Sequence, residues 1–283
     1  MWSLMMRKNN IFAGNKFFAF NVWDIKSAVA VIDTSLEMNI PIFLQVSASV
    51  YSQIDVKGFI DFTKEYIARK NAKVILHLDH SKNVEQIFEA IDLGWDSVMF
   101  DGSTFSLEEN IIRTNQVSNY VKNKNVLVEA ELGIIGNVRD HLGERDKTEI
   151  PITMIEEFIN KTNIDMLALP IGTAHGQYID EIPVINHAFI KEIDMTFDIP
   201  LVVHGGSELP LTELEKLIQH KNVKKINIST DIKQAYRKGI LGSEKNDLLI
   251  EEGFNALLVE REIYKSIKNV VKEKLTVLEM KDG

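Results

Sequence analysis

The chain has 283 residues, of which 45% are hydrophobic and 26% are charged, and it contains no cysteine. The length and composition suit one large domain with a sizeable core, such as an α/β barrel. The formal charge of −9 argues against a nucleic-acid partner, and the lack of cysteine excludes disulfides and thiolate metal sites. No apolar run approaches the ~18 residues of a membrane span. Residues 1–8 lack the pattern of a secretory signal, so we expect a cytoplasmic protein without membrane partners.

Short β-rich runs alternate with longer amphipathic stretches along the chain. Strands are expected at residues 17–21, 41–46, 73–79, 97–100, 126–132, 166–171, 201–203 and 225–228. Helices are expected at residues 24–38, 57–71, 84–93, 107–122, after Pro151, at 184–192 and 211–220, and in the remainder up to the C-terminus. This order predicts an α/β fold, a (β/α)8 TIM barrel with extra C-terminal helices, formed by residues 1–283 as a single domain. A doubly wound open sheet is the alternative, because alternation alone does not show closure.

Histidines follow three of the predicted strands at their carboxyl ends. His80 ends the third strand next to Asp79, His175 follows the sixth strand, and His204 follows the seventh. In a barrel these strand ends meet at one mouth, whatever their distance in sequence. Three converging imidazoles with an open fourth position are typical of a catalytic zinc site. Taken one at a time, His175 could be an ordinary loop histidine and His204 a strand-end histidine bonded to backbone.

The other four histidines do not share this pattern. His77 lies inside the third strand, where we expect a core position or a supporting role behind the site. We interpret His141, His187 and His220, which fall in loops or at helix ends, as surface residues.

Two segments that follow the last two strands have the composition of an anion-binding site. Gly205, Gly206 and Ser207 follow the seventh strand, and residues 227–230 follow the eighth. Barrels often bind phosphate here, because glycine lets backbone N–H groups approach an anion and hydroxyl side chains add donors. A single Gly-Gly-Ser would usually be a turn, but two such segments after adjacent strands favour a phosphate site.

Several carboxylates lie near the same strand ends. Asp79 could orient a histidine or act as a general acid and base. We expect Asp101 and Ser103 to be structural, capping the next helix or bonding neighbours. Glu129 and Glu131 share one face of the fifth strand, and two such carboxylates need partners: a histidine, a second cation or a lysine.

Six sequence blocks together resemble the class II, zinc-dependent ketose-bisphosphate aldolases, which include fructose- and tagatose-bisphosphate aldolases. The resemblance covers about residues 17–236, roughly four fifths of the chain. Its blocks are HLDH at 77–80, GWDSVMFDGS at 94–103, VEAELG at 128–133, GTAHGQY at 172–178, LVVHGGS at 201–207 and KINIST at 225–230.

The resemblance implies a role for each candidate residue. Asp79 would be the proton donor, and His80, His175 and His204 would bind Zn²⁺, with a monovalent cation as a further candidate cofactor. The enzyme would reversibly cleave a phosphorylated ketose into dihydroxyacetone phosphate and an aldehyde, as in glycolysis, and would form a homodimer or homotetramer. The substrate would be held by Ser47, Gly176, Gly205, Gly206, Ser207, Asn227, Ile228, Ser229 and Thr230.

The chain departs from the family pattern in three places. The stretch 136–140 lacks the glutamate of the usual Gly-Gly-x-Glu-Asp loop. In the family this glutamate is thought to assist proton transfer, so its absence puts that role in question for this chain. Glu208 replaces the last glycine of His-Gly-Gly-Ser-Gly and puts a carboxylate beside the expected phosphate site. Residues 245–247 stand where an Asp-Pro-Arg segment is usual, which affects recognition of the far end of the substrate. A non-catalytic paralogue that binds zinc or a sugar phosphate is therefore an alternative, as is another metal-dependent barrel enzyme such as a hydrolase.

Overall fold

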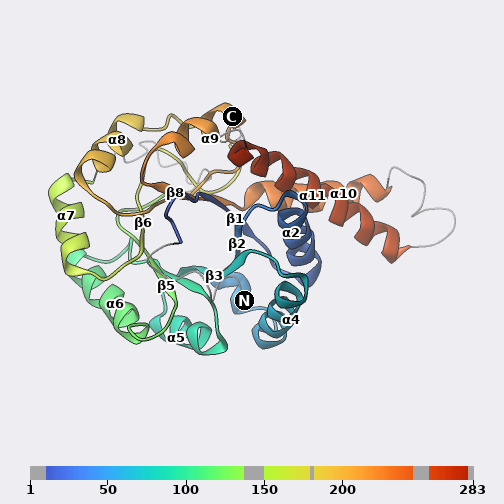
Figure 1. Ribbon diagram of the computed structural model, residues 1–283, viewed down its shortest axis with the longest axis horizontal. Helices are drawn as coiled ribbons and strands as arrows, with labels where there is room; N and C mark the ends of the chain where they lie inside the picture. The colour runs from blue at the N-terminus through green and yellow to red at the C-terminus, as the bar shows by residue number, and fades with distance from the viewer. Residues whose placement is uncertain (1–10, 137–149, 179–181, 245–254, 280–283) are drawn as a thin grey trace.

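Eight parallel strands form a closed barrel in the computed structural model, which describes residues 11–136, 150–178, 182–244 and 255–279 (Figure 1). Each strand pairs with the next along the chain, and β1 pairs with β8 to close the sheet. The predicted barrel is confirmed, and the open-sheet alternative is wrong. The strands are β1 Phe17–Asn21, β2 Ile42–Ser47, β3 Val74–Ser81, β4 Ser97–Phe100, β5 Leu127–Glu131, β6 Met166–Ala168, β7 Leu201–Val203 and β8 Val223–Ile228.

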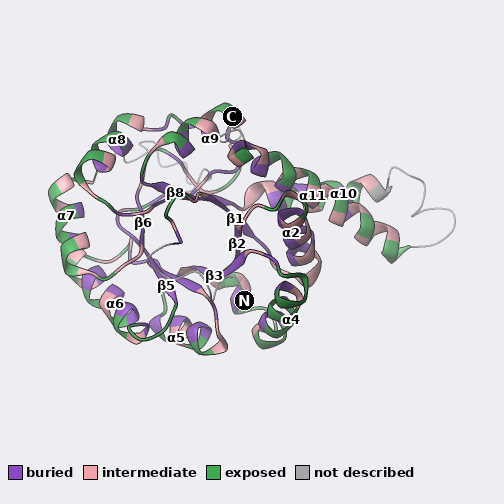
Figure 2. Cartoon of the chain, viewed as in Figure 1, coloured by how far each residue is buried: buried purple, intermediate pink, exposed green. Residues whose placement is uncertain are grey.

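Helices surround the barrel and turn their apolar faces toward the strands (Figure 2). The surrounding helices are α2 Ile25–Met38, α4 Val56–Lys70, α5 Val84–Leu93, α6 Leu107–Tyr120, α7 Ile152–Lys161, α8 His187–Thr196 and α9 Leu211–Gln219. A short α3, Ala48–Tyr51, follows β2 directly. None of the helices in the described ranges is long and apolar enough to cross a membrane.

Local sequence explains where the expected boundaries shift. The predicted sixth strand reaches residue 171, but β6 ends at Ala168, and Pro170 lacks the N–H group that would continue the ladder. The predicted helix 184–192 instead runs from His187 to Thr196, because the Asn186 side chain caps it by accepting a hydrogen bond from Phe189 N. α5 ends at Leu93 as expected, with Gly94 as its left-handed cap (φ 92°).

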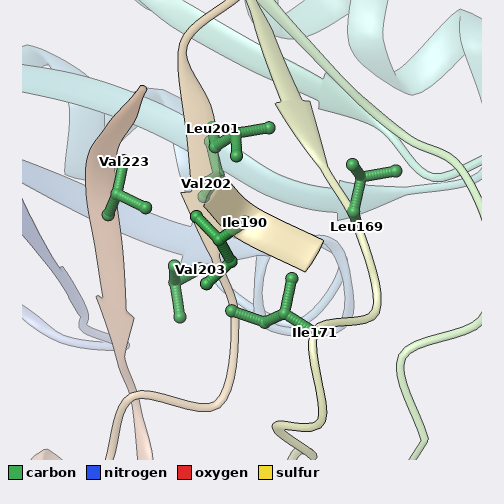
Figure 3. Close-up of a pocket in the computed structure, with 7 residues that line it drawn as sticks. All are labelled: Leu169, Ile171, Ile190, Leu201, Val202, Val203 and Val223. Atoms are coloured by element: carbon green, nitrogen blue, oxygen red, sulfur yellow. The ribbon is translucent and has the colours of Figure 1, made fainter. Parts of the chain in front are cut away.

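Apolar packing supports the strands from inside and outside. Between β6, β7 and α8, Ile190 lies among Ile171, Leu201 and Val203 (Figure 3). A separate apolar cluster fills the inside of the barrel and includes Ile11, with Phe12 packed against it. Its strand members are Phe17, Ala19, Phe43, Ile75, Leu127, Met166, Ala168 and Val202. This packing fixes the strand ends from which the site residues project.

Two C-terminal helices, α10 Thr230–Glu244 and α11 Ala256–Glu279, lie side by side and extend beyond the ring of helices (Figure 1). They confirm the expected extra C-terminal helices. The first turn of α10 is tied to α11 by an ion pair between Asp231 and Lys274, 3.0 Å apart and largely buried. The start of α10 is therefore held from behind by α11.

Candidate functional site

Three histidine rings meet at the mouth of the barrel, as expected from their positions at the end of β3, in the loop after β6 and directly after β7. The ring centroids of His80 and His204 are 4.5 Å apart, those of His80 and His175 4.8 Å, and those of His175 and His204 5.5 Å. One nitrogen of each can be chosen so that all three lie within 4.8 Å of one another. This arrangement suits a single metal ion with an open coordination position.

His80 and Asp79 both reach the site because β3 is irregular at its end. In a regular strand, adjacent side chains point to opposite faces. The register of β3 with β4 shifts between Leu78 and Ser81, and His80 has a left-handed backbone conformation (φ 54°). For a residue other than glycine this conformation costs about 1–2 kcal/mol. The irregularity brings an acid and an imidazole that are neighbours in sequence to one mouth.

A buried charge network holds His204. His204 Nε2 lies 2.9 Å from Glu129 Oε1, and Lys225 Nζ donates to Glu129 Oε2 at 2.7 Å, with all three side chains fully buried. The partners expected for Glu129, a histidine or a lysine, are both present. Because Glu129 accepts a hydrogen bond from Nε2–H, the His204 Nδ1 atom carries the lone pair available to a metal.

His77 lies beneath this network as expected, and it is fully buried. Its Nδ1 atom lies 2.7 Å from Ser97 Oγ, and its Nε2 atom is 3.5 Å from Glu129 Oε2. His77 therefore lies next to Glu129, although its Nε2 atom makes no hydrogen bond within the described residues, and it is not one of the three converging rings.

A second group of possible metal ligands shares His80 with the first and adds Asp101 and Glu131. His80 Nδ1 lies 3.4 Å from Asp101 Oδ2 and 3.6 Å from Glu131 Oε2. Asp101 accepts hydrogen bonds from Ser103, as expected of a residue that bonds its neighbours, and it also contacts His80. Glu131 likewise has a histidine partner.

The protonation of the three rings is set by burial and by these carboxylates. Burial lowers the pKa of His175 to about 4 and the pKa of His204 well below its ordinary value. Both rings are therefore neutral at pH 7, which is the form that binds a metal. Burial alone would lower the pKa of His80, but Asp79, Asp101 and Glu131 raise it to about 9. Burial raises the pKa of Glu131 to about 8.

Asp79 is held by residues from β1 and β2. Asn21 Nδ2 donates to Asp79 Oδ2 at 2.9 Å, and Gln45 Nε2 donates to Asn21 Oδ1 at 2.7 Å. Burial alone would raise the pKa of Asp79, but nearby His80 and the Asn21 hydrogen bond help to hold it below its ordinary value. The sequence interpretation missed Asn21, although it ends β1 just as Asp79 lies near the end of β3.

Several buried polar atoms at the mouth have no hydrogen-bond partner within the described residues. They include His80 Nε2, Asp79 Oδ1 and Asn227 Oδ1. Buried polar atoms are almost always satisfied in folded proteins, so these atoms identify a place where a ligand belongs. The neutral rings of His175 and His204 fit a zinc ion, and so does the unpartnered His80 Nε2 atom, because metal binding releases the proton of a ligating histidine.

The segments expected to bind phosphate lie at the same end of the barrel. Ser207 Oγ accepts bonds from Ser229 N at 3.0 Å and from Asp231 N at 3.3 Å. Thr230 opens α10, so its backbone lies at a helix N-terminus, which favours anions. A Cβ atom on Gly205 (φ 71°) would lie 2.3 Å from Ala174 O, so only glycine lets these loops approach this closely.

The remaining candidate substrate-binding residues, Ser47, Gly176 and Ile228, differ in what they can offer a ligand. Ser47 lies beside Asp79 in the β2–β3 register, and its side chain caps α3 by accepting a hydrogen bond from Val50 N. Gly176 directly follows His175. The Ile228 side chain is fully buried in the hydrophobic core, so it offers a ligand only its backbone.

The structure corrects our interpretation of two other histidines as surface residues. His187 and His220 are partly buried and stack with ring centroids 5.2 Å apart. Carboxylates flank the pair: Glu213 Oε1 is 2.5 Å from His187 Nε2, and Asp194 Oδ2 is 3.1 Å from His220 Nδ1. His141 and the departures at 137–140 and 245–247 lie outside the described residues.

Residues 12–283 match the model of the family described as fructose-bisphosphate aldolase class-II. The chain belongs to this family. Class-II aldolases are carbon–carbon lyases that act on phosphorylated sugars, so the non-catalytic alternative is not favoured.

Two curated relatives of this aldolase show similar levels of identity. Sulfofructosephosphate aldolase from Alkalicoccus urumqiensis is 34% identical over 225 residues, which cover 78% of this chain and 77% of the relative. The D-tagatose-1,6-bisphosphate aldolase subunit GatY from Klebsiella oxytoca is 33% identical over 220 residues, which cover 77% of both chains.

Solved structures of similar proteins have the same barrel. The YdjI aldolase from Escherichia coli K12 has a TM-score of 0.78 at 25% identity, covering 98% of this aldolase and 94% of that chain. A putative fructose-1,6-biphosphate aldolase from Coccidioides immitis has a TM-score of 0.80 at 22% identity, with the same coverage. At that identity the second likeness concerns the fold alone.

Proposed function

We propose that this aldolase binds Zn²⁺ through His80, His175 and His204 and reversibly cleaves a phosphorylated ketose into dihydroxyacetone phosphate and an aldehyde. The observation that carries the proposal is the convergence of three imidazoles, one nitrogen of each lying within 4.8 Å of the others, together with a His80 Nε2 atom that has no hydrogen-bond partner within the described residues. Three histidines with an open position are the ligand set of a catalytic zinc ion. When bound, Zn²⁺ would act as a Lewis acid that polarises the ketose carbonyl.

In our proposal Asp79 moves the proton of the cleaved alcohol. Its lowered pKa keeps the carboxylate ionised at neutral pH. In the cleavage direction it would take the proton of the C4 hydroxyl as the C4 oxygen becomes the aldehyde carbonyl. The C3–C4 bond would break, and its electron pair would form the C2–C3 double bond while the negative charge moves to the C2 oxygen. A proton from water would then add to C3 and complete dihydroxyacetone phosphate. In synthesis the protonated Asp79 returns that proton to the new alkoxide. Asn21 orients the carboxylate by its hydrogen bond to Oδ2.

We assign the phosphate of the dihydroxyacetone half to the loops after β6, β7 and β8. Gly176, Gly205 and Ser207 would contribute backbone N–H groups, and residues 227–230 would contribute the start of α10. Gly206 would line the same site, since its own N–H group donates to Asn227 O at 3.1 Å. Ser47 would contact the same half from β2, since it is paired in register with Asp79. A monovalent cation in addition to zinc stays a prediction.

The proposal is tested by measuring metal content and cleavage together. The purified protein is expected to contain zinc and to release dihydroxyacetone phosphate from at least one ketose phosphate, with loss of activity after chelation and recovery with zinc. The names of the relatives differ in the sugar, so the panel includes fructose-1,6-bisphosphate, tagatose-1,6-bisphosphate and a sulfofructose phosphate. Protein that neither binds zinc nor cleaves any of these compounds would contradict the proposal.

The cytoplasmic location and the homodimer or homotetramer stay predictions from the sequence. Light scattering after gel filtration measures the oligomer directly.

A further inference from the structure

Glu208 occupies a backbone position that favours glycine. It directly follows Ser207 and has φ 60°, in the left-handed region that residues with side chains seldom adopt. A glycine here would avoid a backbone cost, so the glutamate side chain needs a compensating role. The side chain is only partly exposed and is held by hydrogen bonds on both carboxylate oxygens.

These hydrogen bonds connect two parts of the site. The Tyr178 backbone N–H, in the loop after β6, donates to Glu208 Oε2 at 2.7 Å. The Gln234 side chain, on α10, donates to Glu208 Oε1. We call this connection of loop, Glu208 and α10 the Glu208 bridge.

Tyr178 also forms hydrogen bonds to the segment that carries His175, so the Glu208 bridge is connected to that segment. The Tyr178 hydroxyl donates to Ala174 O at 2.8 Å or Gly205 O at 2.9 Å, and it accepts a hydrogen bond from Ala174 N at 3.0 Å. Ala174 directly precedes His175. Tyr178 therefore hydrogen-bonds both the backbone N–H and the backbone C=O of the residue next to the His175 ring. Hydrogen bonds therefore link the loop after β6 to the turn after β7.

The other side of the bridge is anchored in the C-terminal helices. Glu208 N donates to the Asp231 carboxylate, with distances of 3.1 and 3.2 Å to its two oxygens. Asp231 in turn pairs with Lys274 of α11 at 3.0 Å. This pair is largely buried, so its position is fixed more firmly than that of a surface ion pair.

We propose that Glu208 is a positioning residue that fastens the loop carrying His175 to α10, and so sets the place of this ring against His80 and His204. The proposal rests on the proposed zinc-binding role of these histidines. It predicts that zinc affinity depends on a residue that makes no contact with the metal.

The test compares Glu208→Gly with Glu208→Gln. Glycine suits φ 60° and removes the bridge, so the melting temperature should not fall, while the zinc dissociation constant rises about tenfold, at the lower end of the effect of residues that orient metal ligands. The visible spectrum of the Co²⁺-loaded variant should change, because that spectrum reports ligand geometry. Glutamine retains an acceptor for Tyr178 N and can donate to a turned Gln234 amide, so it should keep zinc affinity within about twofold.

Asn71→Gly is the matched control, because Asn71 also has a positive φ (52°) but caps α4 away from the site. It should leave the Co²⁺ spectrum and zinc affinity unchanged. Wild-type zinc affinity and an unchanged Co²⁺ spectrum in Glu208→Gly would overturn the inference while leaving the proposed function intact. Equal losses in the glycine and glutamine variants would also overturn it, because charge rather than the bridge would then matter. A wild-type protein that binds no zinc would overturn the proposed function, and this inference with it.

Discussion

His204 Nε2 and Glu129 Oε1 lie 2.9 Å apart in the interior of the barrel, where neither side chain is exposed. Glu129 fixes the ring of His204 and directs its second nitrogen away from the carboxylate. Lys225 forms a buried ion pair with Glu129. The proposed metal ligand His204 is therefore hydrogen-bonded to one member of an internal ion pair.

Removing this charge should affect both metal binding and folding. Glu129→Gln is expected to weaken zinc binding about 10- to 100-fold, because the ring of His204 loses its charged acceptor. It should also destabilise the fold by about 3–5 kcal/mol, since Lys225 is left buried without a counter-charge. Chelator competition and urea unfolding measure the two effects. Glu129→Gln combined with Lys225→Met should recover part of the stability but not the zinc affinity, and a double variant no more stable than the single one would contradict this explanation.

Asp79 and His204 should separate catalysis from metal binding. Asp79→Ala is expected to retain zinc and to lose about 10²–10⁴ of kcat, the usual contribution of a general acid or base. His204→Ala is expected to lose both zinc and turnover. Metal analysis and the dihydroxyacetone phosphate assay on the same preparations check both results. Full turnover in Asp79→Ala would show that another group moves the proton.

Asn21 should influence the pH at which the aldolase works. Burial already favours the neutral form of Asp79, and the Asn21 hydrogen bond helps to lower its pKa. Asn21→Ala removes this hydrogen bond, so the pKa of Asp79 should rise. Asp79 should then become protonated at a higher pH when the solution is acidified. The acid limb of kcat/KM for cleavage should therefore move to higher pH, with zinc retained. An unchanged acid limb would mean that Asn21 does not act on Asp79.

Glu213, which lies away from the site, should make the free energy of unfolding depend on pH in the acid range. Burial alone would raise the pKa of Glu213, but hydrogen bonds from His187 and Lys216 lower it below 4.5. The folded state then binds fewer protons than the unfolded state, so this stabilisation is present above about pH 4.5 and is lost as the pH falls through the folded pKa. The stability difference between wild type and Glu213→Gln should be larger at pH 6 than at pH 3.5 in urea unfolding. A difference independent of pH would contradict the assignment, and Glu157→Gln controls for loss of an exposed carboxylate.

The sequence predicted the barrel because each element carries its own local signal. The strands at 17–21, 97–100 and 201–203 agree with the structure at both ends, and the other boundaries shift by a few residues. Strand ends converge in any barrel, so the meeting of His80, His175 and His204 could be expected from topology alone.

Contacts between distant strands could not be predicted in the same way. Glu129 clearly needed a partner, but the choice of Lys225, 96 residues away, depends on how β5 and β8 face each other inside the closed barrel. The pair of His187 and His220 was missed because it depends on how α8 and the end of α9 pack. Single-residue patterns carry no information about such packing.

The irregular end of β3 also limits how this enzyme can change. Asp79 and His80 are joined by one peptide bond, so the spacing between the proposed acid and the proposed metal is set by main-chain geometry rather than by side-chain packing. Exchanges in loops that carry none of the three histidines would therefore change the shape of the site while the reacting groups keep their separation. A one-residue insertion or deletion within residues 78–81 would instead separate the two groups, and no loop exchange elsewhere could restore them.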